Sequence, residues 1–267
     1  MTRLSPRHPR YASLRLRARL AAAARRGIVV PEGLIAQGRA EAFDYLLGER
    51  TTPSARRAEK LVARWLLAAQ RPVLSVNGNV AALAATEVAE LAQALPSLGI
   101  EVNLFHRTPA RVRAIASVLR QAGVRPVLGT RPTRRIPGLP SDRALVDADG
   151  IWRADLCVIP LEDGDRAEAL HRRGARIVAI DLNPLSRTAQ SADVAIVDEL
   201  TRALRGITAE LRRGPRPLPL STLPAWARRL PELTLERMRR SLPRPSARGW
   251  SAGRPPRGSA RRSRRRR

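Results

Sequence analysis

Five short strand-like runs, with longer segments between them, constrain the fold of this chain more than any other feature of its sequence. The runs occupy residues 73–76, 101–105, 156–160, 177–180 and 194–197, and residues 124–128 are a further candidate. Several of the segments between them have helical length and spacing, such as 80–95 and 109–122. Strands that alternate with helices predict an α/β fold, a parallel sheet flanked by helices with right-handed crossovers.

The sequence outside this region predicts a helical N-terminal segment and a basic C-terminal tail. Helices are expected at residues 11–26, 38–47 and 53–69, and Thr52 and Pro53 provide an N-cap and an N1 proline for the third. Residues 129–150 have the composition of a loop, and a helix over 199–213 would close the domain. We therefore divide the chain into a main domain (1–213), a proline-rich segment with one possible short helix (214–240) and a disordered arginine-rich tail (241–267).

The net charge of +27 says less about function than its size suggests. Thirteen arginines and no acidic residue lie between residues 237 and 267, and Lys60 is the only lysine of the chain. The tail therefore leaves open non-specific contact with polyanions, or a nucleic-acid-binding function. No apolar run approaches the roughly 20 residues of a membrane span, so we expect no membrane association and a cytoplasmic location. Cys157 cannot form an internal disulfide and is expected to be a small buried side chain.

Polar residues that could bind a nucleotide follow the run 177–180. Asp181 and Asn183 come directly after it, at the end of a strand where open α/β sheets bind ligands. Arg187 lies a few residues further on, between the hydroxyls of Ser186 and Thr188. A carboxylate and an amide can hold a ribose or a base, and an arginine can hold phosphate. An ordinary polar connection has the same composition, so the residue types alone leave both interpretations open.

Three other places are candidates for substrate binding. Asn77, Gly78 and Asn79 follow the run 73–76 and precede a helix, which suits a phosphate or simply a tight turn. Acidic residues that include Asp163 and Asp165 follow the run 156–160 and begin a helical segment. There they would stabilise the helix start or bind Mg²⁺ or a substrate amine. Arg39 follows Gly38, the expected start of a helix, where an arginine is unfavourable unless it binds an anion. The three histidines are too scattered to predict a metal site.

Long motifs between Ser5 and Leu211 resemble those of the archaeal phosphopantothenate synthetases, which are also called 4-phosphopantoate–β-alanine ligases. The resemblance is carried, in order, by HPRYASL, GLIAQGRAEAFDYLLGERT, PVLSVNGNVAAL, EVNLFHRT, RRIPGL, VIPLEDGDRAEAL and AIDLNPLSRTAQSADVAIVD. It implies a Rossmann-like homodimer that joins 4-phosphopantoate to β-alanine while ATP becomes AMP and pyrophosphate, in coenzyme A biosynthesis. An acyl-adenylate and Mg²⁺ fit this reaction, which needs no protein nucleophile.

The resemblance also implies residue roles. The positions that match expected ATP contacts are Arg17, Arg39, Asp181, Leu182, Asn183, Arg187, Thr188, Glu199 and Leu200. The residues that the motifs leave as candidates for substrate binding are Asn77, Asn79, Asn103, Arg107, Asp163 and Asp165. The chain departs from the usual AHGRGEAFDY pattern at Gln37, which replaces a histidine, and at Ala40, which replaces a glycine.

A second resemblance offers an alternative. The strand end IDLNP followed by ADVAIV is similar to nucleotide-binding or NAD-binding domains of the sirtuin type and to the middle domain of thiamine enzymes. It covers only about 25 residues and leaves the motif GLIAQGRAEAFDYLLGE without an explanation. The ligase is therefore the first prediction, and the nucleotide-binding domain and the nucleic-acid protein are the alternatives.

Overall fold

A five-stranded parallel sheet lies at the centre of the protein, which we describe from a computed structural model for residues 5, 7–8, 10–161 and 164–242. The strand order is β2-β1-β5-β6-β7. The strands are β1 (Pro72–Val76), β2 (Gly99–Val102), β5 (Leu156–Pro160), β6 (Arg176–Ile180) and β7 (Val194–Ile196). The predicted α/β class and four of the five predicted strand positions are confirmed to within a residue.

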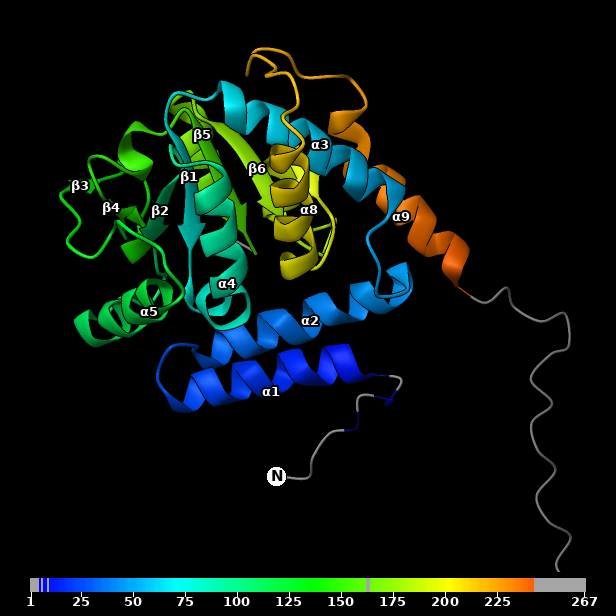
Figure 1. Ribbon diagram of the computed structural model, residues 1–267, viewed down its shortest axis with the longest axis horizontal. Helices are drawn as coiled ribbons and strands as arrows, with labels where there is room; N and C mark the ends of the chain where they lie inside the picture. Colours follow the sequence, from blue (N-terminus) through cyan, green and yellow to red (C-terminus); the bar gives the residue numbers. More distant parts are fainter. Residues whose placement is uncertain (1–4, 6, 9, 162–163, 243–267) are drawn as a thin grey trace, which may run out of the picture.

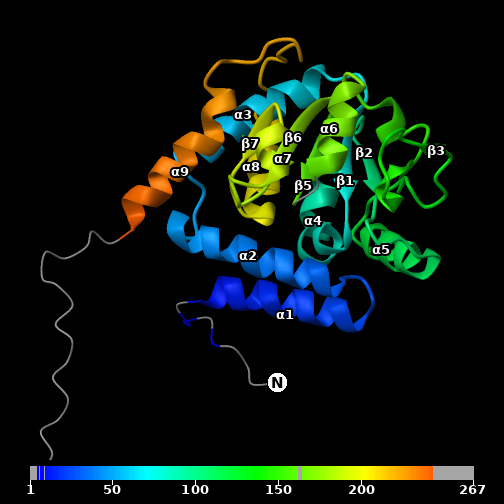
Figure 2. The same ribbon diagram turned by 180° about the vertical axis from the view of Figure 1, so that it is seen from behind.

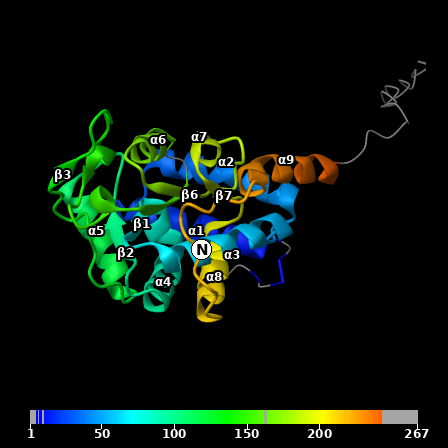
Figure 3. The ribbon, with the colours of Figure 1, turned by 90° about the horizontal axis from the view of Figure 1, so that it is seen from above.

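Helices cover both faces of the sheet (Figures 1 and 3). One face carries α3 (Pro53–Ala68), α4 (Gly78–Ala94), α5 (Pro109–Gln121) and α8 (Leu200–Arg212). The other face carries the shorter helices α6 (Gly164–Arg172) and α7 (Arg187–Ser191), as Figure 2 shows. Side chains cap the helix starts: Thr52 caps α3, Thr108 caps α5 and Glu199 caps α8. The helices α3, α5 and α8 therefore begin where the sequence predicts.

The N-terminal helices form a hairpin that crosses the carboxyl ends of the strands (Figure 1). They are α1 (Tyr11–Arg25) and α2 (Pro31–Leu47). The predicted start of α2 at residue 38 is wrong, because Pro31 occupies the first turn and the helix passes through Gly33 and Gly38. The turn between the helices is held by Arg111 of α5, which donates to the Ile28 carbonyl oxygen from Nε at 3.3 Å and from a terminal nitrogen at 3.2 Å. This contact fixes the hairpin above the sheet.

Two strand predictions need correction. The run 101–105 forms a strand only over Gly99–Val102, and residues 124–128 form no strand beyond a single bridge from Leu128 to Glu101. Pro126 has no N–H to donate to a ladder, which limits pairing there. The expected loop 129–150 contains a small antiparallel pair, β3 (Arg134–Arg135) and β4 (Leu145–Val146). We call residues 129–150 the excursion. The buried Glu101 carboxylate holds its C-terminal end by accepting backbone N–H groups from Asp147 (3.0 Å) and Ile151 (2.6 Å).

The described part of the C-terminal segment packs against the main domain. Trp65 of α3 donates its indole N–H to the Thr222 carbonyl oxygen at 3.1 Å. The predicted helix within residues 224–240 is a short 3₁₀ turn (Ala227–Arg229) followed by α9 (Leu230–Ser241), which packs on α2, α3 and β7. The tail from residue 243, where we predict disorder, lies outside the described residues. Among the residues that the structure covers, none of the helices has the length and apolar character to cross a membrane.

Candidate active site

A pocket of about 290 Å³ lies in front of the carboxyl ends of β1, β2 and β5. The strand order reverses between β1 and β5, and such a switch point is where open α/β sheets bind ligands. We call it the switch-point pocket. Helix α2 covers it, and its lining consists of Val30, Glu32, Gly33, Ala36, Arg39, Asn77, Gly78, Asn79, Leu104, Phe105, His106, Arg111, Arg143 and Leu161.

Two predicted substrate candidates, Asn77 and Asn79, lie in this pocket, and each also holds the backbone around it. The Asn77 side chain caps α4 by accepting the Val80 N–H at 3.0 Å. The Asn79 amide donates to the Gly33 carbonyl oxygen at 2.7 Å, which ties α4 to α2. Gly78 lies so close to the Ile28 carbonyl oxygen that a Cβ would collide with it. The motif therefore presents the N-terminus of α4 to the pocket.

Three arginines give the switch-point pocket a positive charge. They are Arg39 from α2, Arg111 from α5 and the buried Arg143 from the segment 129–150, against one carboxylate among the described lining residues, Glu32. Burial lowers the pKa of Arg111, and Glu32 opposes this shift. With the α4 N-terminus, these cations suit an anion such as phosphate. Sequence reasoning missed Arg111 and Arg143, because arginine is common throughout the chain.

Asn103 and Arg107 lie behind the pocket and do not line it. The buried Asn103 amide donates to the carbonyl oxygens of Arg143 and Leu145, both at 3.1 Å, and its oxygen accepts from Arg166. Arg107 donates to the Gly129 carbonyl oxygen at 2.6 Å, and burial lowers its pKa. Both residues therefore position the excursion that carries Arg143.

A second, smaller cavity lies on the other side of α2, and we call it the hairpin cleft. Its volume is about 50 Å³, and it is lined by Ala12, Ser13, Leu16, Arg17, Gln37, Glu41, Asp44, Glu49, Leu182, Glu199 and Arg202. Three expected ATP contacts that are far apart in the sequence, Arg17, Leu182 and Glu199, meet here. Gln37, at a position where the family has a histidine, faces the same cleft, whereas Ala40 packs into the core beside Leu182.

Arg17 is held by a carboxylate and a phenol of α2. Its Nε donates to Glu41 Oε2 at 2.7 Å, and a terminal nitrogen lies 3.3 Å from the Tyr45 hydroxyl. Burial alone would raise the pKa of Glu41, but hydrogen bonds from Arg17 and Tyr45 outweigh burial and lower it. Arg17 is half exposed, so its remaining N–H groups can reach a ligand.

Glu199 brings an unused acceptor to the hairpin cleft. Its Oε2 caps α8 by accepting N–H groups from Thr201 (3.0 Å) and Arg202 (3.1 Å). Its Oε1 is buried and accepts no hydrogen bond from any described residue. A buried carboxylate oxygen without a donor is costly unless a ligand supplies one. Leu200, by contrast, is buried in the core as the first residue of α8.

The remaining predicted contacts lie at the end of β6. Asp181 Oδ1 accepts the Asn183 N–H at 2.9 Å and shapes the turn that follows. Arg187 and Thr188 belong to α7 and not to a loop, because Ser186 caps a helical turn there. Arg187 is exposed and pairs with Asp165 (2.6 Å) and Glu168 (3.3 Å), so Asp165 faces this end of the sheet and not the switch-point pocket.

The acidic residues considered as ligands for Mg²⁺ or a substrate amine can be placed only in part, since Asp163 lies outside the described residues. Within residues 10–161 and 164–242, no cluster of three or more His, Cys, Asp or Glu side chains is arranged to hold a metal ion. Arg39 is also not at a helix start, because it is the ninth residue of α2. The argument from the helix dipole for Arg39 is therefore wrong, although the residue does line a pocket.

Comparison with known proteins gives a consistent result. A 4-phosphopantoate–β-alanine ligase of Methanospirillum hungatei is 56% identical over 200 residues, which is 75% of this chain and 81% of the relative. The ligase of Thermococcus onnurineus is 52% identical over 214 residues, which is 80% of this chain and 81% of the relative. The family model for phosphopantothenate/pantothenate synthetase matches residues 54–215, far beyond the stretch that carries the sirtuin-like alternative. The chain belongs to the phosphopantothenate/pantothenate synthetase family.

Proposed function

We propose that this protein is a ligase that joins 4-phosphopantoate to β-alanine, with conversion of ATP to AMP and pyrophosphate. The two curated relatives described above carry the name of this activity. The observation that supports it best is the pair of cavities on either side of α2, one lined by three arginines and the other by Arg17, Leu182 and Glu199. Such a pair suits two substrates that must react with each other.

In this proposal the nucleoside of ATP lies at the hairpin cleft and the carboxyl ends of β6 and β7. A ribose hydroxyl donates to Glu199 Oε1, which lacks a donor among the described residues. The cleft is too small for a nucleoside as it stands, so α1 must move outward from α2 when ATP binds. The phosphates then extend past Arg17 and Arg39 toward the switch-point pocket, and Arg187 at the start of α7 contacts one of them.

The switch-point pocket would hold 4-phosphopantoate. Its phosphate binds among Arg39, Arg111 and Arg143, and its carboxylate faces the α-phosphate of ATP. Attack of the carboxylate gives an acyl-adenylate and releases pyrophosphate, and the amine of β-alanine then displaces AMP. Arginines and the α4 N-terminus stabilise the charge that develops on phosphate, and positioning of the amine supplies much of the remaining rate. Mg²⁺ would be held mainly by the phosphates, with a water shell, and would neutralise their charge.

One assay tests the reaction. Purified protein is incubated with ATP, Mg²⁺, β-alanine and either 4-phosphopantoate or pantoate, and the nucleotide products are separated. We expect AMP only when both β-alanine and 4-phosphopantoate are present. Release of ADP, or equal turnover of pantoate, would contradict the proposal.

The assignment of the phosphate to the switch-point pocket has its own test. Arg143→Gln should raise the KM for 4-phosphopantoate on the order of tenfold or more, because a charge-assisted hydrogen bond of roughly 1.5–3 kcal/mol is lost. The KM for ATP should change little. A larger change for ATP would place the nucleotide in this pocket instead. We also propose a homodimer, which light scattering of the purified protein would reveal.

A further inference from the structure

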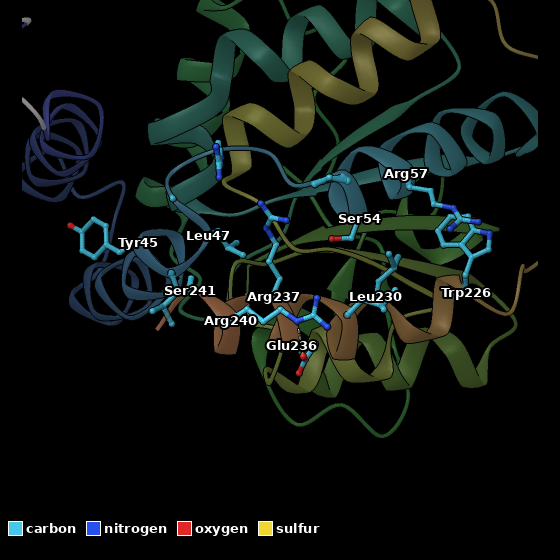
Figure 4. A pocket seen from close by; sticks show the side chains of 15 residues that line it. Tyr45, Leu47, Ser54, Arg57, Trp226, Leu230, Glu236, Arg237, Arg240 and Ser241 are labelled. Carbon is cyan, nitrogen blue, oxygen red and sulfur yellow. Dashed lines mark hydrogen bonds and ion pairs between the residues drawn. The ribbon is translucent and has the colours of Figure 1, made fainter. Parts of the chain in front are cut away.

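A groove of about 680 Å³ lies between the C-terminal end of α2, the start of α3 and α9. The proposed ligase reaction does not use it. Its walls are the end of α2, the first turn of α3 and one side of α9 (Figure 4). We call it the α9 groove. The whole α9 wall lies beyond residue 215, where the match to the family model ends.

The described side chains that line the α9 groove carry mainly positive charge. The groove is lined by Arg50, Arg57, Arg237 and Arg240, and Glu236 is the one acidic residue among the described lining residues. Glu236 is already engaged by Arg239 and Arg240, which lower its pKa to about 2. Arg50 and Arg237 have no carboxylate within ion-pair distance among the described residues. Figure 4 shows Arg237 rising from α9 into the groove between Leu47 and Ser54.

The floor of the groove is apolar. It is formed by Leu46, Leu47, Leu230 and Leu233, and Leu233 is 44% exposed although it lies beside buried neighbours. At one end, the Arg57 guanidinium lies 4.1 Å from the centre of the Trp226 ring. This stacked pair is a flat platform with a positive charge, which suits a planar or aliphatic group next to an anion. An apolar floor with a cationic rim therefore defines the chemistry of one ligand.

We propose that the α9 groove binds an organic phosphate, a phosphate ester with an apolar or aromatic body. The body lies on the leucines and on the Arg57–Trp226 platform, and the phosphate lies between Arg50 and Arg237. A phosphate dianion fits better than a carboxylate, because cations from the α2–α3 connection, α3 and α9 converge and the N-terminus of α3 adds its own positive end. The volume is that of an ordinary small-molecule site.

Calorimetric titration of the full chain tests this without ATP or ligase substrates, so its outcome is independent of the ligase assay. The probes share an eight-carbon tail: octyl phosphate, octanoate and the neutral octyl glucoside. We expect one saturable site for octyl phosphate, at least tenfold tighter than for octanoate, and no measurable site for the glucoside. Equal binding of octanoate would overturn the choice of phosphate, and equal binding of the glucoside would overturn the role of charge.

Variants locate the site and control for the basic tail. Arg50→Gln with Arg237→Gln should weaken octyl phosphate binding at least tenfold. Arg172→Gln with Arg212→Gln removes the same charge from exposed positions outside the groove and should leave the affinity within twofold. Leu233→Glu places a carboxylate in the groove without removing a charged group and should also abolish binding, whereas Leu185→Glu, at a position 54% exposed elsewhere, should not. Equal loss in the control variants would overturn the proposal.

Discussion

Arg187, one of the expected nucleotide contacts, forms ion pairs with acidic residues of α6. Its guanidinium is exposed and pairs with Asp165 and Glu168. Arg187 begins α7, and the turn that contains Asp181 and Asn183 connects it to the end of β6. A phosphate at this end of the sheet would compete with those carboxylates for the same N–H groups. In the structure, the two acids hold the Arg187 guanidinium in place.

Replacement of Arg187 by alanine tests its role. We expect kcat/KM for ATP to fall on the order of tenfold to a hundredfold, because a charge-assisted hydrogen bond to phosphate is lost. Arg187→Lys should recover only part of this, because an ammonium group cannot make a two-pronged contact. Steady-state kinetics at varied ATP measure the effect. If Arg187→Ala keeps normal kinetics while Asn183→Ala does not, the phosphate contact belongs to Arg17 or Arg39.

Glu59 makes stability depend on pH. Its carboxyl is fully buried between α3 and α8, and burial raises its pKa from 4.5 to about 8, with Arg56 opposing and Asp198 and Glu210 adding to the shift. The unfolded chain ionises this group near pH 4.5, but the folded chain does so only near pH 8. The folded state therefore loses stability between these values and no further above them.

Glu59→Gln should remove this dependence. The free energy of unfolding of the variant, relative to the native protein, should rise by up to about 4 kcal/mol between pH 5 and pH 8.5, because only the native protein has to ionise a buried carboxyl in this range. Urea unfolding at several pH values measures the difference. Glu90→Gln on α4 is the matched control, and an equal rise there would assign the effect to net charge.

At the scale of elements, Arg202 fastens α8 to the N-terminal hairpin. Its terminal nitrogens contact the two Asp44 oxygens of α2 at 2.6 and 3.1 Å, and it also donates to Asp198 at 2.6 Å. Burial acts against its charge, but the hydrogen bonds that it donates to the two carboxylates, together with their negative charges, outweigh burial and raise its pKa. Both carboxylates are themselves buried, and Arg202 is the cation that contacts both of them.

Arg202→Met should destabilise the protein by about 3–5 kcal/mol, because two buried carboxylates lose their cation. Thermal or urea unfolding measures this. Addition of Asp44→Asn and Asp198→Asn to the same chain should recover part of the loss, since neutral amides tolerate burial better. Arg212→Met, at the exposed end of α8, should have little effect. Failure of the asparagine variants to recover any stability would point to lost packing instead.

The elements also show how far sequence patterns reach. Strands β5 and β6 and helices α3 and α8 follow from short apolar runs, caps and a proline, which are local signals. The start of α2 was wrong because two glycines interrupt a helix that Pro31 begins and tertiary contacts complete. The pocket arginines Arg111 and Arg143 could not be chosen from so many others, because only the sheet brings them to one place. Arg17, Leu182 and Glu199 were found through family resemblance, and their meeting depends on the same topology.

At the scale of the whole molecule, every described residue that lines the three cavities precedes residue 242. A chain ended after Leu242 should therefore keep kcat and KM within about twofold, a change under roughly 0.5 kcal/mol. It should also leave a heparin column at much lower salt, because the lost arginines supply contacts to polyanions. A large loss of activity at saturating substrates would show that the tail takes part in the enzyme.

The strand order described for the sheet also sets a sequence of events for the growing chain on the ribosome. β1 pairs with β2 soon after both are made, but its other neighbour, β5, begins 84 residues later, where Pro72 faces Leu156. Until then one edge of β1 is open, with unpaired backbone groups of the kind that lead to aggregation. A nascent chain arrested near residue 150 should therefore pellet or bind chaperones, and one arrested beyond residue 222, with α3 covered, should remain dispersed.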